Sequence, residues 1–165
     1  MPSPSLKIYL AGPDVFAPNQ QEHGESLKTI TKSFSFTPLY PLDNEILESD
    51  NLSKDIFCSN VEMIKQADII VANLNAFRGS EPDSGTVWEI GYAHALGKRI
   101  IGYTNDTRPM KTKINPETNN IFDKNGWRIE DLDHSHNLMI FNACEIIVEG
   151  SLTNALQHLE KYLQA

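Results

Sequence analysis

The sequence predicts an α/β fold built on a doubly wound parallel sheet. Short apolar segments alternate with longer segments of helical periodicity along the chain. Residues 68–74 are apolar on both faces, which is typical of a central parallel strand. Right-handed crossovers then place helices on both faces of the sheet. Because 165 residues suffice for one core but not for two comfortable ones, we expect a single domain over residues 1–165.

Five segments have the composition of strands, and Gly12-Pro13 closes the first with a turn signal. A proline, Pro38, lies near the end of the second. The predicted strands are residues 7–11, 34–39, 68–74, 99–103 and 145–148.

Helical periodicity follows most of these strands. We expect helices over residues 19–32, after Ser53, after Thr86 and over residues 151–163. Loops are predicted at 41–50 and 104–136, and the length of the second favours a functional loop. The second helix should bury Ile56, Phe57, Val61 and Ile64, and the last should bury Leu152, Leu156, Leu159 and Leu163.

The composition is that of an ordinary globular protein, with 40% hydrophobic and 22% charged residues. A formal net charge of -8 argues against a nucleic acid polymer or an anionic membrane as partner, whereas a small neutral ligand remains open. Cys58 and Cys144 lack a C-x-x-C spacing, and no apolar run reaches the roughly 18 residues of a membrane helix. Residues 1–5 do not resemble a secretory signal, so we expect a cytoplasmic protein.

The candidate chemistry lies between Phe77 and Gly97. Asp83 and Glu89 stand on either side of the predicted boundary between a loop and a helix. Thr86 is the predicted N-cap, Glu89 follows at the spacing of a capping box, and Gly97 supplies a C-terminal stop.

These two acids allow a structural and a chemical interpretation. A capping-box Glu89 needs no catalytic role, and Asp83 can simply brace the turn before Gly85. A carboxylate near a helix N-terminus is also favoured in its ionised form, and is then available as a nucleophile near neutral pH. Glycosyl transfer uses two carboxylates in this way, one attacking the anomeric carbon while the other binds sugar or handles a proton.

Other candidates follow from the predicted topology. Ligands in such folds bind beyond the carboxyl ends of the strands, so the residues from Gly12 and from Asn73 onward are the predicted walls. Tyr9 either fills the core or orients Glu89 from a neighbouring strand. His134 and His136 lack ligand spacing, so no metal site is expected. The sequence contains no G-x-G-x-x-G, G-x-x-x-x-G-K-[ST] or G-x-S-x-G motif.

Four segments together resemble the nucleoside 2-deoxyribosyltransferase family: residues 8–16, 67–74, 77–97 and 137–139. The resemblance extends over most of the chain and is most specific from residue 83 to residue 98. It implies a flavodoxin-like fold and a retaining double displacement, with hydrolysis as a side reaction. The implied substrates are small-molecule 2′-deoxynucleosides and free nucleobases, and no cofactor is required.

The resemblance also implies roles for individual residues. Glu89 would attack C1′ of the deoxynucleoside, Tyr9 would orient Glu89, and Asp83 would hydrogen-bond the sugar. The implied substrate-binding residues are Gly12, Phe16, Asn73, Gly85, Asn137 and Met139.

Within that set, Phe16 would lie against the base. Asn137 and Met139 match a pair that a neighbouring subunit contributes to the sugar pocket, which implies a homo-oligomer. Asn73 stands where the family usually has an aspartate that contacts the base. Because an amide cannot supply a proton as an acid does, we expect altered base preference or slower transfer, with another carboxylate or water delivering the proton.

Two alternatives remain on sequence grounds. A deoxynucleoside 5′-monophosphate N-glycosidase would need a phosphate cradle after strand 1, where residues 12–18 offer an acid and apolar groups instead. A non-catalytic module that binds a nucleotide-like ligand is compatible with the same fold.

Overall fold

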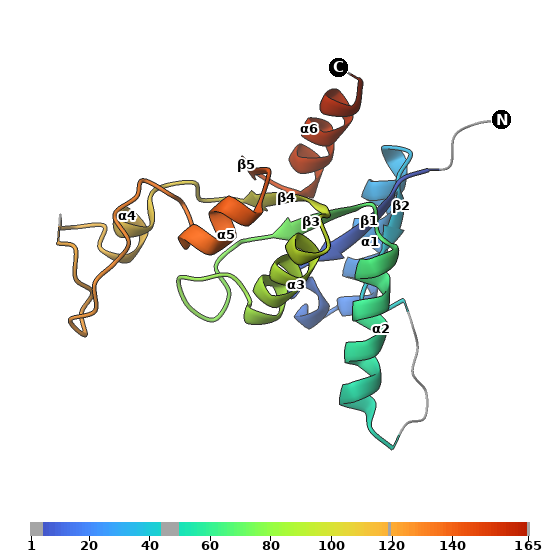
Figure 1. Ribbon diagram of the computed structural model, residues 1–165, viewed down its shortest axis with the longest axis horizontal. Coiled ribbons are helices and arrows are strands. Elements are labelled where there is room, and N and C mark those ends of the chain that lie inside the picture. Colours follow the sequence, from blue (N-terminus) through green and yellow to red (C-terminus); the bar gives the residue numbers. More distant parts are fainter. Residues whose placement is uncertain (1–4, 44–49, 119, 165) are drawn as a thin grey trace.

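Five parallel strands form one sheet, in the order β2-β1-β3-β4-β5, in a computed structural model (Figure 1). The structure describes residues 5–43, 50–118 and 120–164. This architecture confirms the predicted doubly wound α/β fold, and the strand order reverses between β1 and β3. The strands are β1 (Lys7–Ala11), β2 (Thr37–Leu39), β3 (Ile69–Asn73), β4 (Arg99–Thr104) and β5 (Ile146–Glu149).

Helices cover both faces of the sheet. A short 3-10 helix, η1 (Pro13–Phe16), follows β1 directly. The remaining helices are α1 (Gln20–Ser33), α2 (Leu52–Gln66), α3 (Ser84–Ala95), α4 (Met110–Ile114), α5 (Leu138–Ala143) and α6 (Leu152–Gln164). In the described parts of the chain, none of these helices is both long and apolar enough to cross a membrane.

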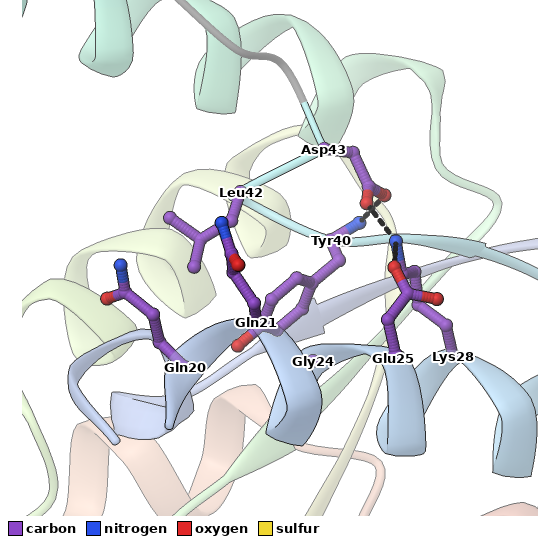
Figure 2. A pocket seen from close by; sticks show the side chains of 8 residues that line it. All are labelled: Gln20, Gln21, Gly24, Glu25, Lys28, Tyr40, Leu42 and Asp43. Atoms are coloured by element: carbon purple, nitrogen blue, oxygen red, sulfur yellow. Dashed lines mark hydrogen bonds and ion pairs between the residues drawn. The ribbon is translucent and has the colours of Figure 1, made fainter. Parts of the chain in front are cut away.

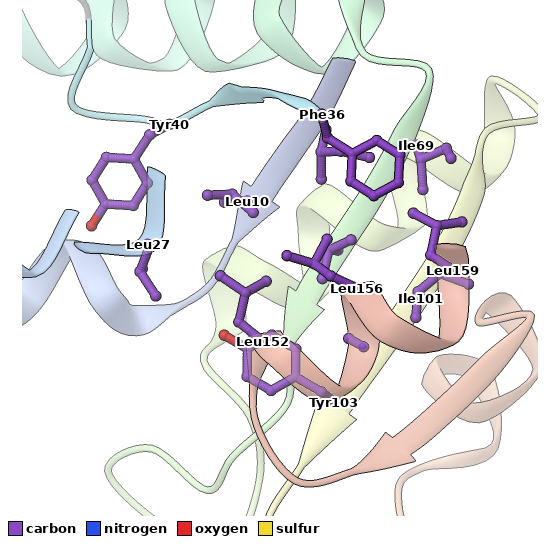
Figure 3. Packing of buried hydrophobic residues seen from close by; sticks show 13 residues of the cluster. Leu10, Leu27, Phe36, Tyr40, Ile69, Ile101, Tyr103, Leu152, Leu156 and Leu159 are labelled. Carbon is purple, nitrogen blue, oxygen red and sulfur yellow. The ribbon is translucent and has the colours of Figure 1, made fainter. Parts of the chain in front are cut away.

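Each face of the sheet has its own hydrophobic core. On one face, α1 and α6 cover β1, β3 and β4, and Figure 3 shows Leu156 and Leu159 of α6 among these side chains. On the other face, Tyr9 and Ile70 of the sheet pack with Ile64 of α2, Ile90 of α3 and Ile140 of α5. The second core adjoins the candidate site described below, and its buried member Tyr9 bears a hydroxyl group.

Several predicted boundaries and faces differ from the structure. The second strand begins at Thr37, because Phe34 ends α1 and Ser35 adopts a φ of 62°. The cap of α2 is Asn51, whose side chain accepts a hydrogen bond from the backbone N–H of Lys54, so Ser53 is already helical.

The apolar face predicted for α2 is buried only in its C-terminal half, where Ile64 is fully enclosed. Ile56 and Phe57 are 43% and 45% exposed, because the N-terminal half of α2 extends away from the sheet (Figure 1). In α6, Leu163 is likewise exposed, whereas the other three predicted leucines are buried. The predicted loop at 104–136 contains the short helix α4, and residues 44–49 of the loop predicted at 41–50 lie outside the described residues.

Candidate active site

The candidate site lies at the carboxyl edge of the sheet, where β1 and β3 end side by side. Ala11 pairs with Ala72 in parallel register, so Gly12 and Asn73 follow at the same level. A Cβ at Gly12 would collide with Oδ2 of Asp14 and would lie 2.8 Å from Cβ of Asn73. Gly12 is therefore required for the close approach of the two strand ends.

A buried core residue, Tyr9, fixes the position of Glu89. Tyr9 is fully buried in β1, and its Oη donates a hydrogen bond of 2.6 Å to Oε1 of Glu89. Burial raises the pKa of Glu89 to about 7, the Tyr9 hydrogen bond opposes this shift, and the negative charge of Asp83 adds to it. Burial and the nearby Glu89 carboxylate raise the pKa of Tyr9 far above its ordinary value, so the phenol stays a donor.

The predicted capping box is wrong. The N-cap of α3 is Asp83, whose Oδ2 accepts hydrogen bonds from the backbone N–H of Thr86 at 3.0 Å and from its Oγ1 at 3.2 Å. Aspartate and threonine are both good caps, and here the aspartate takes that position while Thr86 is buried in the first turn of the helix. Glu89 is then too far along the helix for a capping role.

The expectation that the helix N-terminus keeps Glu89 ionised is also wrong. The dipole acts mainly on the first turn, whereas Glu89 lies in the second turn, where burial dominates and raises its pKa. At neutral pH the carboxyl group is therefore poised between its two protonation states. The predicted stop is confirmed, since Gly97 follows α3 with a φ of 68°.

A cavity of about 340 Å³ opens in front of Glu89. It is lined by Phe57, Asn60, Gly85, Trp88 and Glu89, and the rings of Phe57 and Trp88 meet edge to face at 5.3 Å. Gly85 leaves room for the turn, because a Cβ there would lie 3.0 Å from Oδ2 of Asp83.

The sequence reasoning missed Asn60. Among the described residues, its Oδ1 is one of two buried side-chain polar atoms without a hydrogen-bond partner. An asparagine within the sheet-facing half of a helix was the available signal, because its helix propensity is low.

Phe16 is the last residue of η1, which follows β1. Its side chain is 55% exposed, and its ring stacks on Phe77 at a centroid distance of 5.7 Å, with the guanidinium of Arg78 over both rings. This exposed aromatic surface suits a planar ligand.

Asn73 is engaged within the protein. Its Nδ2 donates to Oδ2 of Asp14 at 3.0 Å, and its Oδ1 accepts hydrogen bonds from the backbone and side-chain nitrogens of Asn75. Oδ1 of Asp14 lies 2.7 Å from Nε2 of His23. Sequence reasoning did not select Asp14 or His23, because nothing in their nine-residue separation indicates that a turn brings them together.

The other predicted residues lie on α5 and in the loop before it. Asn137 caps α5 by accepting from the backbone N–H of Met139, and its Nδ2 donates to Oε1 of Glu130 at 2.6 Å. Met139 is 72% exposed. His136 is buried, with Nε2 2.9 Å from the carbonyl oxygen of Leu74, and the described residues contain no group of three or more potential metal ligands.

Another cavity is separate from Glu89. It measures about 400 Å³ and lies between α1 and the segment after β2 (Figure 2). Lys28 crosses its rim to Asp43 and Glu25, at 2.6 and 2.7 Å. Because Lys28, Glu25 and Asp43 are already paired with one another, we assign this cavity no role in catalysis.

Comparison with known proteins places this site in a family. A family model described as nucleoside 2-deoxyribosyltransferase matches residues 8–139. The chain belongs to the nucleoside 2-deoxyribosyltransferase family. The match covers the strands that carry Tyr9 and Asn73 and the helix that carries Glu89.

One solved structure agrees with this membership of the nucleoside 2-deoxyribosyltransferase family, and a second shares the fold. A 2-deoxyribosyltransferase from Leishmania mexicana is 34% identical, with a TM-score of 0.79, and the match covers 95% of this chain and 98% of that one. A 2-deoxyribosyltransferase from Bacillus psychrosaccharolyticus shares the fold at 24% identity and a TM-score of 0.59, over 94% and 91% of the two chains.

A curated relative, an uncharacterized protein of Schizosaccharomyces pombe, is 32% identical over 113 residues. The match takes in 65% of this chain and 54% of the relative, so it spans about half of that protein's length. The family model and the Leishmania mexicana structure indicate an enzyme of the deoxyribosyltransferase type.

The raised pKa of Glu89 predicts a pH-dependent stability. The folded state holds the Glu89 proton more tightly than the unfolded chain does, so protonation of Glu89 stabilises the fold. This contribution to stability is complete below the ordinary pKa of 4.5 and is lost as pH rises through about 7. Glu89→Gln, which stays neutral, should raise the free energy of unfolding by about 1 to 3 kcal/mol at pH 8, with little difference at pH 4.

Urea unfolding of both proteins at equal concentration measures this difference. Glu62→Gln, at an exposed glutamate of α2, is the matched control and should show no such dependence on pH. An equal effect of Glu89→Gln at both pH values would contradict the raised pKa.

Proposed function

We propose that this enzyme transfers 2-deoxyribose from one nucleobase to another through a covalent deoxyribosyl-Glu89 intermediate. The observation that carries the proposal is the partly buried Glu89 carboxylate, which faces a cavity while Tyr9 holds its other side at 2.6 Å. A carboxylate fixed in this way can attack a carbon atom without first reorganising.

The reaction proceeds in two displacements at C1′ of the sugar. The ionised Glu89 attacks C1′ of a 2′-deoxynucleoside, the C1′–N bond breaks, and the base leaves with the electron pair of that bond. A second base then attacks C1′ of the ester and releases Glu89, so the configuration is retained overall. Water in place of the second base gives hydrolysis as the side reaction.

The remaining residues position the substrate in this scheme. Asp83 hydrogen-bonds the sugar through Oδ1, since both bonds from Thr86 go to Oδ2. Asn60 lines the same cavity as Glu89. Phe16 offers its exposed face to the base. The absence of a 2′-hydroxyl eases the oxocarbenium-like transition state, and no step requires a cofactor.

A neighbouring subunit completes the site in this proposal. Met139 is 72% exposed, and it joins Asn137 at the start of α5. Phe57 and Trp88, at the mouth of the Glu89 cavity, are also about half exposed. A second copy of the chain would cover these apolar groups, and would bring its own Asn137 and Met139 to the sugar.

Base exchange tests the proposed activity. Deoxyinosine with added adenine should yield deoxyadenosine and hypoxanthine, and chromatography measures both products. Deoxyinosine 5′-monophosphate should react far more slowly. Hypoxanthine release from the monophosphate, independent of adenine, would instead indicate an N-glycosidase. Ligand binding without turnover of either donor would indicate a non-catalytic module.

Asn73→Asp tests the role of this residue in base choice. The variant replaces a donor to Asp14 with a second carboxyl group about 3.0 Å from it, and two such groups share a proton. We expect the ratio of transfer rates to adenine and to cytosine to change by roughly tenfold or more. Initial rates with four donor–acceptor pairs measure this ratio. Unchanged rates with every pair would refute a role of Asn73 at the base.

A further inference from the structure

We propose that Asp14 is the acid that protonates the departing nucleobase, and that His23 supplies and takes back its proton. This assignment rests on the proposed transfer of deoxyribose. It gives a catalytic role to Asp14, which contacts Asn73, and to its partner His23, whereas the amide of Asn73 cannot act as an acid.

The geometry makes Asp14 and His23 one proton-holding unit. The distance of 2.7 Å from Oδ1 of Asp14 to Nε2 of His23 is that of a charge-assisted hydrogen bond. The Asp14 side chain is 14% exposed, whereas the His23 side chain is 38% exposed. The carboxyl group is therefore shielded, while the imidazole reaches the solvent from which a proton is drawn.

The fold holds Asp14 in this place by two further contacts. Asn73, at the end of β3, donates to Oδ2 of Asp14 at 3.0 Å. The absence of a side chain at Gly12 leaves the space that Oδ2 occupies. The phenols of Tyr40 and Tyr103 also lie within electrostatic reach, since the charge of Asp14 contributes to the raised pKa of each. Asn73 thus serves as a positioning residue for Asp14.

A cavity of about 300 Å³ adjoins this pair. Its wall combines Asp14 and His23 with the stacked rings of Phe16 and Phe77. An aromatic surface beside an acid–imidazole pair matches a nucleobase, which has a flat face to stack and ring nitrogens that take up protons. Pro13, Ala17 and Pro18 supply the rest of the apolar lining.

Glu89 and Asp83 already have different tasks. Glu89 must be ionised to attack C1′, so it cannot hold the proton for the base at the same moment. Asp83 uses Oδ2 to cap α3 and has no titratable partner as close as His23 is to Asp14. Of these three carboxyl groups, Asp14 is therefore the one left for proton transfer.

Proton transfer to the base accompanies cleavage of the C1′–N bond. As Glu89 forms its bond to C1′, the C1′–N bond breaks and its electron pair stays on the base. A ring nitrogen of the base takes the proton from Asp14, and Asp14 takes the proton that His23 carries. In the second displacement the incoming base loses its N–H proton to Asp14 and His23, so the pair returns to its first state.

A donor that needs no protonation separates this role from a structural one. The base of 7-methyl-2′-deoxyinosine is already cationic, so it leaves without a proton from the enzyme. Asp14→Asn should slow hypoxanthine release from deoxyinosine by about 10²–10⁴-fold, the usual contribution of a general acid. The loss with the methylated donor should be at least tenfold smaller. His23→Gln should show the same selectivity with a smaller loss, because Gln can still donate a hydrogen bond to Asp14.

Glu22→Gln, at an exposed acid on the same helix as His23, is the matched control and should slow neither donor. Two outcomes would overturn the assignment while leaving the transfer reaction intact. In one, Asp14→Asn and His23→Gln each slow base release equally with both donors; in the other, neither variant slows base release. If Asp14→Asn fails to fold, His23→Gln alone decides between these outcomes. A wild-type protein that releases base from neither donor would overturn the proposed transfer, and with it the role of Asp14.

Discussion

The hydrogen bond of 2.6 Å between Tyr9 and Glu89 ties the chemistry of this protein to its core. Tyr9 belongs to the apolar cluster between the sheet and α2, α3 and α5, so the position of its hydroxyl is set by packing rather than by a mobile loop. The same burial that orders Tyr9 removes water from Glu89 and raises its pKa to about 7. Position and ionisation of Glu89, the proposed nucleophile, therefore have one origin, and the protein gives up stability at neutral pH to maintain it.

Three carboxyl groups at one edge of the sheet differ in what surrounds them. Glu89 has a single donor and a cavity in front of it, whereas Asp83 is tied to the first turn of α3 by two bonds from Thr86. Asp14 lies between Asn73 and His23. In the proposed reaction these surroundings divide the work into attack on the sugar, binding of the sugar and proton transfer to the base. The parallel sheet makes the division possible, because it brings the ends of β1 and β3 to the same level.

The sequence predicted the features that depend on local composition. The strand at Ile69–Asn73 is apolar on both faces, and the contact of Tyr9 with Glu89 followed from the order of the elements and the family resemblance. The cap of α3 was misplaced because two good capping residues stand three positions apart. Periodicity identified an apolar face on α2, but it cannot tell whether anything covers that face, and Phe57 is exposed. The pairing of Asp14 with His23 depends on the turn through η1, which no spacing rule describes.

The most direct test of the central claim is to trap the covalent intermediate on Glu89. A 2′-deoxy-2′-fluoronucleoside slows breakdown of the ester, because the fluorine withdraws electrons from C1′. Intact mass spectrometry followed by peptide mapping should find one fluorodeoxyribosyl group on the peptide that contains Glu89, and none in Glu89→Gln. An adduct on another residue, or base exchange by the wild type with no adduct on Glu89, would contradict the account.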